Sequence, residues 1–183
     1  MDKIDGDVLA LDTKVYLTAA LRCLNAPLLP LDPGRAAQSL LAELESLQAA
    51  AGARFDVAPA LAAARALVER LERVAAALDR VDPRVVPGAA LDDINRGVMR
   101  LSRILVPLAY TSGDRFTHDL ALPLQPLAGL QGARQLAALD PESDAFKFAR
   151  AALVRERNRA VHALDSALAV AAELLSLEQG GRR

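Results

Sequence analysis

The chain has 183 residues, 52% of them hydrophobic, so it is long and apolar enough to bury a core of its own. A net charge of −1 excludes the overall positive field that is typical of proteins that bind nucleic acid or anionic membranes. The one cysteine, Cys23, excludes an internal disulfide framework and a four-thiolate zinc site, and we expect it to be a small core residue.

The N-terminal residues do not have the pattern of a targeting segment. No basic stretch is followed there by an apolar run, and no run in the chain reaches the length that spans a bilayer. The sequence therefore predicts a soluble chain without a signal peptide or a transmembrane segment.

Two helices are predicted before Gly52. The first covers residues 9–24 and ends before Pro27, because the residue that precedes a proline is pushed out of the helical region. The second begins at Asp32, a suitable N-cap, with Pro33 at the first helical position. Its apolar stripe is Leu40, Leu41, Leu44 and Leu47. That stripe predicts burial against other helices.

A third helix is predicted from about Asp56 to about Val81, where Asp82 and Pro83 stop it. Its inward positions are Leu61, Ala64, Val68, Leu71, Ala75 and Leu78. Because several of these residues are alanines, we expect this helix to approach its neighbours closely.

The fourth helix organises the predicted fold. Its stripe alternates spacings of three and four and consists of Leu91, Ile94, Val98, Leu101, Leu105 and Leu108. Asp92 and Arg96 lie outside the stripe and are spaced for an ion pair on the solvent side. Pro107 predicts a bend or an end of the helix within a residue or two of Val106.

Two further helices follow. Residues 127–139 form a short, weaker pattern, and a long helix is predicted from Asp140-Pro141-Glu142 to about Leu177. The stripe of the long helix is Phe146, Ala149, Leu153, Ala160, Leu164, Ala167, Ala171 and Leu175. A helix of this length needs several partners, and no segment has the alternation typical of a strand. The sequence predicts an all-α, antiparallel bundle of four main helices, with an N-terminal helix and a short helix before the last one.

Known metal and nucleophile patterns do not fit the chemistry-bearing residues. His118 and His162 are the two histidines, and neither has a second histidine at a metal-ligand spacing. The pair His118-Asp119 is found in metal-dependent phosphohydrolases, which need further histidines that this chain does not have. The Glu-x-x-His pattern of di-iron bundles fails because Arg115 and Arg159 precede the two histidines by three residues. We expect no catalytic residue, metal site or cofactor in this chain.

Two surfaces remain as candidates for function. Arg155, Arg157 and Arg159 are the densest positive charge, which indicates either a solvated, salt-bridged face or an anion site. The stretch after the fourth helix is longer than the usual helix connection of about two to eight residues. Its candidate contact residues are Tyr110, Arg115, Phe116, His118 and Asp119. We expect Phe116 and His118 to fix this loop to the bundle, the alternative being a mobile linker.

The order of several motifs resembles one protein family. Arg22 to Asp32 resembles the segment that closes the catalytic domain of the glutamate carboxypeptidase and transferrin receptor family of zinc-peptidase-like proteins. The C-terminal helical domain of that family is similar, in order and separation, to four later stretches of this chain. They are Phe55-Asp56 before a long helix, Asn95 to Leu105, Phe116-x-His118 followed by Pro123, and Asp140-Pro141 before a terminal helix.

This resemblance covers almost the whole chain and implies its function. In the family this domain is a helical bundle that mediates two-fold dimerisation, and its loop after the fourth helix reaches toward the active site. Residues 1–52 would then correspond to the end of the catalytic domain, and 53–183 to the dimerisation domain. The family's zinc ligands and catalytic glutamate precede the position of Asn25, so zinc is implied for an upstream catalytic domain and not for this chain.

One departure concerns substrate specificity. Glutamate-releasing members have a Lys-Tyr pair just beyond the proline that matches Pro123, where this chain has Leu124 and Gln125. Glutamate specificity is therefore not implied, even for a parent peptidase.

The sequence leads to a ranked set of functions. The first is a non-catalytic dimerisation and interdomain module of a zinc-dependent peptidase-like protein. Its partners would be a second copy, bound through the apolar edges of the third and last helices, and an upstream catalytic domain, and neither nucleic acid nor membrane. The second is an independent helical adaptor that binds a protein through its Arg-rich face, and a helical ligand-binding bundle is the third.

Overall fold

A computed structural model of the protein describes residues 5–113 and 123–180. All regular structure in these residues is helical. The elements are α1 (Gly6–Asn25), α2 (Pro33–Ala51), the 3-10 helix η1 (Gly52–Arg54), α3 (Ala58–Leu78), α4 (Gly88–Tyr110), the 3-10 helix η2 (Ala128–Ala138) and α5 (Asp144–Gly180). This confirms the predicted all-α bundle of four main helices, with an N-terminal helix and a short helix before the last one.

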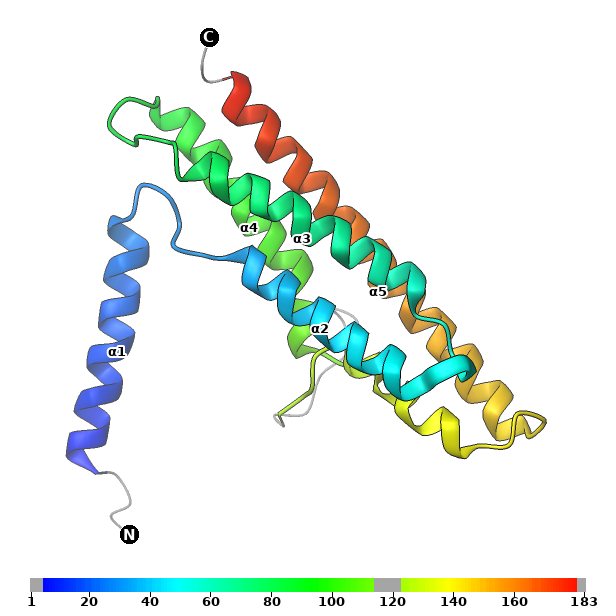
Figure 1. The fold of residues 1–183 in the computed structure, drawn as a ribbon. Coiled ribbons are helices and arrows are strands. Elements are labelled where there is room, and N and C mark those ends of the chain that lie inside the picture. Colours follow the sequence, from blue (N-terminus) through cyan, green and yellow to red (C-terminus); the bar gives the residue numbers. More distant parts are fainter. Residues whose placement is uncertain (1–4, 114–122, 181–183) are drawn as a thin grey trace.

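Four long helices, α2 to α5, form the bundle (Figure 1). Helices α2 and α4 run in one direction, and α3 and α5 run in the opposite one. Helix α5, with 37 residues and a length of about 55 Å, contacts α3, α4 and η2. Helix α2 contacts α3, α4 and η2 on the other side of the core. The core therefore lies between α2 and α5 and is closed by α3 and α4.

The starts of two helices show how short side-chain contacts set their boundaries. At α2 the predicted cap is confirmed, because Asp32 Oδ1 accepts a hydrogen bond from the Arg35 amide (3.1 Å). At α5 the prediction of a start at Asp140 is wrong. The helix begins at Asp144, since Ser143 Oγ accepts from the Phe146 amide at 3.2 Å and donates to the Asp140 carbonyl at 2.6 Å.

The predicted stripes of α2, α4 and α5 face the core. In α4, Ile94, Val98, Leu101 and Leu105 are buried, and the end residues Leu91 and Leu108 are half-buried. The predicted α3 stripe also faces the core, except that Ala75 is exposed, and the buried face extends to Val74 and Ala77. Its buried face is wide because α3 packs against both α2 and α5. The alanines near its start allow these close contacts.

The sequence predicted a bend or an end of α4 near Val106, and the structure excludes the end. The helix continues through Pro107 to Tyr110, and its C-terminal turn is closed because the Thr111 amide donates to the Pro107 carbonyl (3.2 Å). The ring of Pro107 removes one backbone donor, but Leu105 is buried and Leu108 is packed against the core cluster. Burial on both sides of the proline keeps the backbone helical.

Helix α1 differs from all the others because it contacts no other element. It has no buried residue, and Figure 1 shows it beside the bundle at the end of an extended connection. Cys23 lies on this helix and is exposed, so the prediction that it is a core residue is wrong. The helices that contact one another therefore begin with α2, and the domain boundary predicted after residue 52 stays a prediction.

Helix α5 also corrects the prediction that no segment reaches membrane-spanning length. Residues 144–177 are long and apolar enough to cross a bilayer by length and composition. In the structure the same helix has a third of its most apolar window buried, against the other bundle helices. A core helix of a bundle passes this test too, so the feature is weak evidence for a membrane.

Candidate functional site

The structure places one of the five predicted contact residues. Tyr110 is the last residue of α4, and 70% of its surface is exposed. Arg115, Phe116, His118 and Asp119 lie outside the described residues. Their predicted roles, with Phe116 and His118 fixed to the bundle, stay predictions.

Both ends of the connection between α4 and η2 are attached to the bundle at the same place. On the α4 side, the Thr111 hydroxyl donates to the Pro107 carbonyl (2.9 Å). On the η2 side, the amide of Leu127 donates to the Leu108 carbonyl (2.8 Å), a group near the helix end that would otherwise need water or a capping donor. The described ends of this connection are thus attached within one helical turn of α4.

Leu127 has the one left-handed backbone of a non-glycine residue among the described residues, with a φ of 55° and a ψ of 44°. For such a side chain this conformation costs roughly 1–2 kcal/mol. Burial of the leucine side chain and a hydrogen bond from the Leu130 amide to the Leu127 carbonyl (2.7 Å) offset it. This strained residue lies directly before the first residue of η2.

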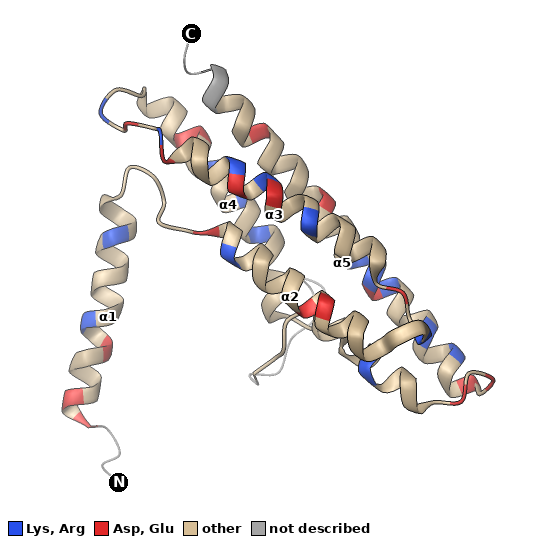
Figure 2. Cartoon of the chain, viewed as in Figure 1, with Lys and Arg blue, Asp and Glu red and all other residues tan. Residues whose placement is uncertain are grey.

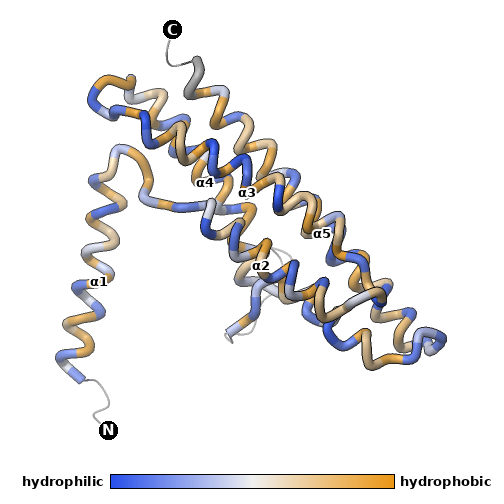
Figure 3. The backbone as a smooth tube through the Cα atoms, in the orientation of Figure 1, coloured by the Kyte–Doolittle hydropathy of each residue, from blue (hydrophilic) through white to orange (hydrophobic). Residues whose placement is uncertain are grey.

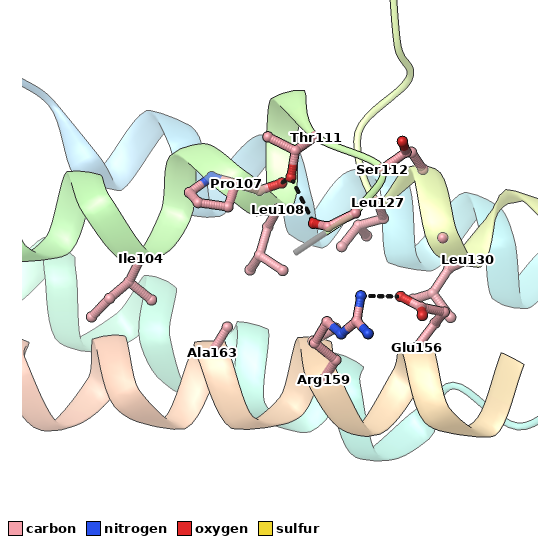
Figure 4. Close-up of a pocket in the computed structure, with 14 residues that line it drawn as sticks. Ile104, Pro107, Leu108, Thr111, Ser112, Leu127, Leu130, Glu156, Arg159 and Ala163 are labelled. Atoms are coloured by element: carbon pink, nitrogen blue, oxygen red, sulfur yellow. Dashed lines mark hydrogen bonds and ion pairs between the residues drawn. The ribbon is translucent and has the colours of Figure 1, made fainter. Parts of the chain in front are cut away.

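A pocket of about 300 Å³ lies between this return point and α5 (Figure 4). Its walls are mainly apolar and come from α4, η2 and α5: Ile104, Leu108, Leu127, Leu130, Ala160 and Ala163. Thr111 and Ser112 line one side, and on the other side Arg159 Nη1 lies 3.4 Å from Glu156 Oε2. The pocket can accept an apolar group with a polar end.

The polar side chains of the described lining are Thr111, Ser112, Glu156 and Arg159. Its one carboxylate, Glu156, forms an ion pair with Arg159, so its charge is already compensated. No histidine or cysteine is among the described residues that line the pocket. Gly129 is needed here, because a Cβ at its position would lie 2.4 Å from Glu156 Oε2. The described part of the pocket is thus a place where η2 packs closely on α5.

The Arg-rich stretch of α5 is largely engaged by the bundle itself (Figure 2). Arg157 Nη1 donates to the Asp56 carbonyl (3.0 Å), and its guanidinium carbon lies 5.7 Å from the centre of the Phe55 ring. Arg159 pairs with Glu156, and Arg155 Nε donates to a carbonyl one turn before it. These contacts favour the interpretation of a salt-bridged face over that of an anion site.

Hydrophobic segments recur from one end of α1 to the other, with hydrophilic ones between them (Figure 3). Its exposed large hydrophobic residues are Val8, Leu9, Leu11, Val15, Tyr16, Leu17, Leu21 and Leu24, each with 49–81% of its surface accessible. No other helix of the described chain has such a set: α4 exposes Met99, Val106 and Tyr110, α5 exposes Phe148 and Leu177, and α3 exposes none. The dimer surface expected on α3 and α5 is therefore small in apolar terms.

The connection from α1 to α2 is held by a single polar side chain of α4. Asn95 Oδ1 accepts from the Leu29 amide and Asn95 Nδ2 donates to the Pro27 carbonyl, both at 2.9 Å. The Leu31 amide then donates to the Leu29 carbonyl at 2.8 Å, which closes a three-residue turn around Pro30. We call these contacts the Asn95 clamp.

Among the described residues, perturbed pKa values are found at Asp82, in the turn between α3 and α4, and at Arg96, which directly follows Asn95. Hydrogen bonds from the Arg84 side chain and backbone lower the pKa of Asp82, and Asp93 raises the pKa of Arg96 through a hydrogen bond and its charge. Arg96 pairs with Asp93 rather than with the predicted Asp92. Among the described residues, no group of three or more His, Cys, Asp and Glu side chains could hold a metal ion.

Sequence reasoning missed the pocket and the Asn95 clamp and did not foresee that α1 is uncovered. The pocket depends on a left-handed leucine that no residue pattern signals. The clamp joins positions more than sixty residues apart, although Asn95 stands beside the stripe residue Ile94. The signal for α1 was available, because its leucines do not keep to one stripe. Comparison with protein-family models, curated proteins and solved structures found no match to this chain.

Proposed function

We propose that this chain is a non-catalytic interdomain and dimerisation module of a zinc-dependent, peptidase-like protein. The observation that carries the proposal is the contrast between a bundle that buries its own stripes and a helix α1 that buries nothing. Residues 22–32 resemble the end of a catalytic domain in that family, which suggests the domain that could cover α1. In this proposal α1 packs on the catalytic domain, and α2 to α5 form the attached bundle.

The distribution of side chains around α1 indicates the kind of partner. Asp7, Lys14, Thr18 and Asn25 recur at spacings of seven, four and seven residues and so form one narrow polar strip. Apolar side chains occupy much of the remaining circumference, which is interrupted by Asp12, Thr13 and Arg22. A helix that is hydrophobic almost all round is normally buried from several sides. A folded domain with a groove between layers can cover α1 in this way, whereas one partner helix covers a single stripe.

The helical state of α1 also argues for a partner. An isolated helix of about 20 residues is only marginally stable in water, even with caps. Helix α1 has a cap, since Asp5 Oδ1 accepts from the Asp7 amide at 2.9 Å, but it has no tertiary contact among the described residues. Packing against a second domain would supply the missing stabilisation.

The proposal assigns the chemistry to the partner domain. Zinc ligands and a catalytic acid would belong to the upstream catalytic domain, and this chain would supply neither. Two further parts of the proposal are that the chain works in water, with α5 as a core helix rather than a membrane span, and that it binds no nucleic acid.

The proposed two-fold dimer has a different candidate surface from the one expected at first. The exposed residues Met99, Val106 and Tyr110 lie on one face of α4, whereas α3 exposes no large hydrophobic residue. Light scattering of the chain lacking residues 1–26, over a concentration series, separates dimerisation through the bundle from association through α1. A monomer at every concentration would remove the dimer from the proposal.

An independent adaptor is the second candidate function. The contacts of its Arg-rich face within the bundle count against it. Arg157 and Arg159 are engaged in contacts within the bundle, which leaves Arg155 as the most available of the three. A partner would have to compete with these contacts. The exposed apolar surface of α1 favours the interdomain module.

The test has a genetic and a biochemical step. We expect the reading frame to extend upstream of the codon for Met1 and to encode His, Asp and Glu zinc ligands. The encoded upstream region, expressed separately, should bind this chain. A Leu17→Asp, Leu21→Asp variant should lose the binding, and Lys14→Asp on the polar strip should keep it. The proposal would be contradicted by an in-frame stop codon that leaves no room for a catalytic domain upstream of Met1. Binding that both variants retain would contradict it too.

A further inference from the structure

The connection between α1 and α2 contains more ordering features than a flexible linker needs. Pro27 and Pro30 each restrict one backbone torsion, and the Leu29 carbonyl closes a turn with the Leu31 amide. Leu28 is half-buried and packs against the core cluster. The chain between the two helices is therefore restrained along most of its length.

Among the described residues, Asn95 is the residue of α4 whose side chain joins this connection to the bundle by hydrogen bonds. Its carboxamide oxygen and nitrogen meet an amide and a carbonyl on either side of Leu28, both at 2.9 Å. Each carboxamide atom thus faces a backbone group of the opposite hydrogen-bonding type, so the amide is satisfied in one orientation only. Aspartate would lose the donor, and alanine would lose both contacts.

The apolar packing beneath the connection is incomplete. A pocket of about 350 Å³ lies between the linker residues Leu28, Leu29 and Leu31 and the helices α3 and α4. Apolar contacts across such an open space restrain the linker weakly, because unfilled volume has no partner atoms. The two hydrogen bonds of Asn95 are then the main restraint on this part of the backbone.

We propose that Asn95 is a positioning residue that fixes the direction in which α1 leaves the bundle, so that whatever domain covers α1 is held at a set angle to α2–α5. The chain acts as a rigid bracket between two bodies rather than as a tether. The inference concerns the geometry of this chain alone. It therefore stands or fails independently of whether the partner is a peptidase domain.

The natural position of Cys23 makes the inference measurable. This cysteine is exposed, lies near the end of α1 and is the one cysteine of the chain. A second cysteine at Glu72, an exposed position of α3, gives a pair of spin labels across the clamp. Labelled protein is diluted with unlabelled protein, so that pairs within one molecule dominate the measured distances.

The expected result is a narrow distance distribution for the parent and a broad one for Asn95→Ala. Hydrogen exchange of the Leu29 amide should become about two- to tenfold faster in that variant, as the loss of one hydrogen bond predicts. Asn95→Asp keeps the acceptor for Leu29 but not the donor for Pro27. It should therefore keep most of the amide protection while broadening the distances.

Two controls keep the test decisive. Asn158→Ala removes an exposed asparagine of α5 that does not contact the linker, and it should change neither readout. Thermal unfolding of each variant shows whether the bundle is intact, and Asn95→Asp carries the test if Asn95→Ala does not fold. Equal distance distributions in the parent and both Asn95 variants would overturn the inference, as would a broad distribution in the parent.

Discussion

Helices α1 and α2 are nearly equal in length, with 20 and 19 residues, and both are rich in leucine and alanine. Helix α2 buries Ala37, Leu40, Leu44, Leu47 and Ala51, whereas α1 buries nothing. The difference lies in the arrangement of the apolar side chains. In α2 they keep to one stripe that a single layer of helices can cover, and in α1 they surround the helix. Apolar content thus predicts that a helix needs cover, and periodicity predicts how many sides must be covered.

Shortening one leucine in each helix tests whether α1 and α2 differ in their contribution to the free energy of unfolding. Leu44→Ala should lower the free energy of unfolding by about 2–5 kcal/mol, because Leu44 is fully buried and the truncation leaves a cavity. Leu17→Ala in α1 should change it by no more than about 0.5 kcal/mol, since 57% of that residue is exposed. Urea unfolding measures both. Similar losses would mean that α1 packs on the bundle in solution.

A second test concerns the close approach of the bundle helices to one another. Helix α1 has no such close contact with another helix. Gly97→Ala should destabilise the bundle by about 1–3 kcal/mol, because the new Cβ would lie 2.5 Å from Leu174 Cδ2 of α5. The flexible Leu174 side chain has to move. Gly88→Ala, at the open start of α4, meets no atom within 4 Å and should be neutral or slightly stabilising. Thermal unfolding of both variants distinguishes crowding from helix propensity.

Removal of residues 1–26 tests whether α1 contributes to the stability of the bundle. The shortened chain should keep the free energy of unfolding of the bundle within about 0.5 kcal/mol, because α1 contacts no other element. It should also aggregate less, since the largest set of exposed apolar side chains in the described chain is gone. Urea unfolding and light scattering give the two values. A loss of several kcal/mol would show that α1 belongs to the bundle.

The smallest expected effect is at the turn between α3 and α4. Hydrogen bonds from Arg84 lower the pKa of Asp82, so this carboxylate stabilises the folded turn above its unfolded pKa of about 3.9. That contribution is lost as the pH falls through the lower folded pKa. Because Asp82 is exposed to solvent, the effect is small and weakens with salt. Asp82→Asn should remove this part of the acid dependence, as NMR titration of the parent and the variant can show.

The elements of the bundle were predictable because their signals are local. Asp32 followed by Pro33 marks the start of α2, and Leu101 and Leu105 lie in a stripe that only helical packing explains. The full buried face of α3 was not predictable from the sequence. Val74 and Ala77 are buried and Ala75 is exposed because of the way α3 packs against α2 and α5.

The end of α4 and the site show the limits of local signals more plainly. Pro107 predicts a helix end, but burial of Leu105 and the cap at Thr111 continue the helix past it. Asn95 has the same local pattern as any polar residue beside a stripe. Its role depends on a chain segment more than sixty residues earlier, and no periodicity carries that information.

The hydrogen bond from the Leu127 amide to the Leu108 carbonyl has a consequence for how this protein can vary. It joins the two described ends of this connection at α4, so a change in the length of the chain between them can leave those ends in place. Doubling the length of such a closed segment costs only about 0.6 kcal/mol in chain entropy. Related proteins can therefore differ widely in sequence and length at this position while the helices stay in place, and a foreign peptide inserted there should leave the bundle folded.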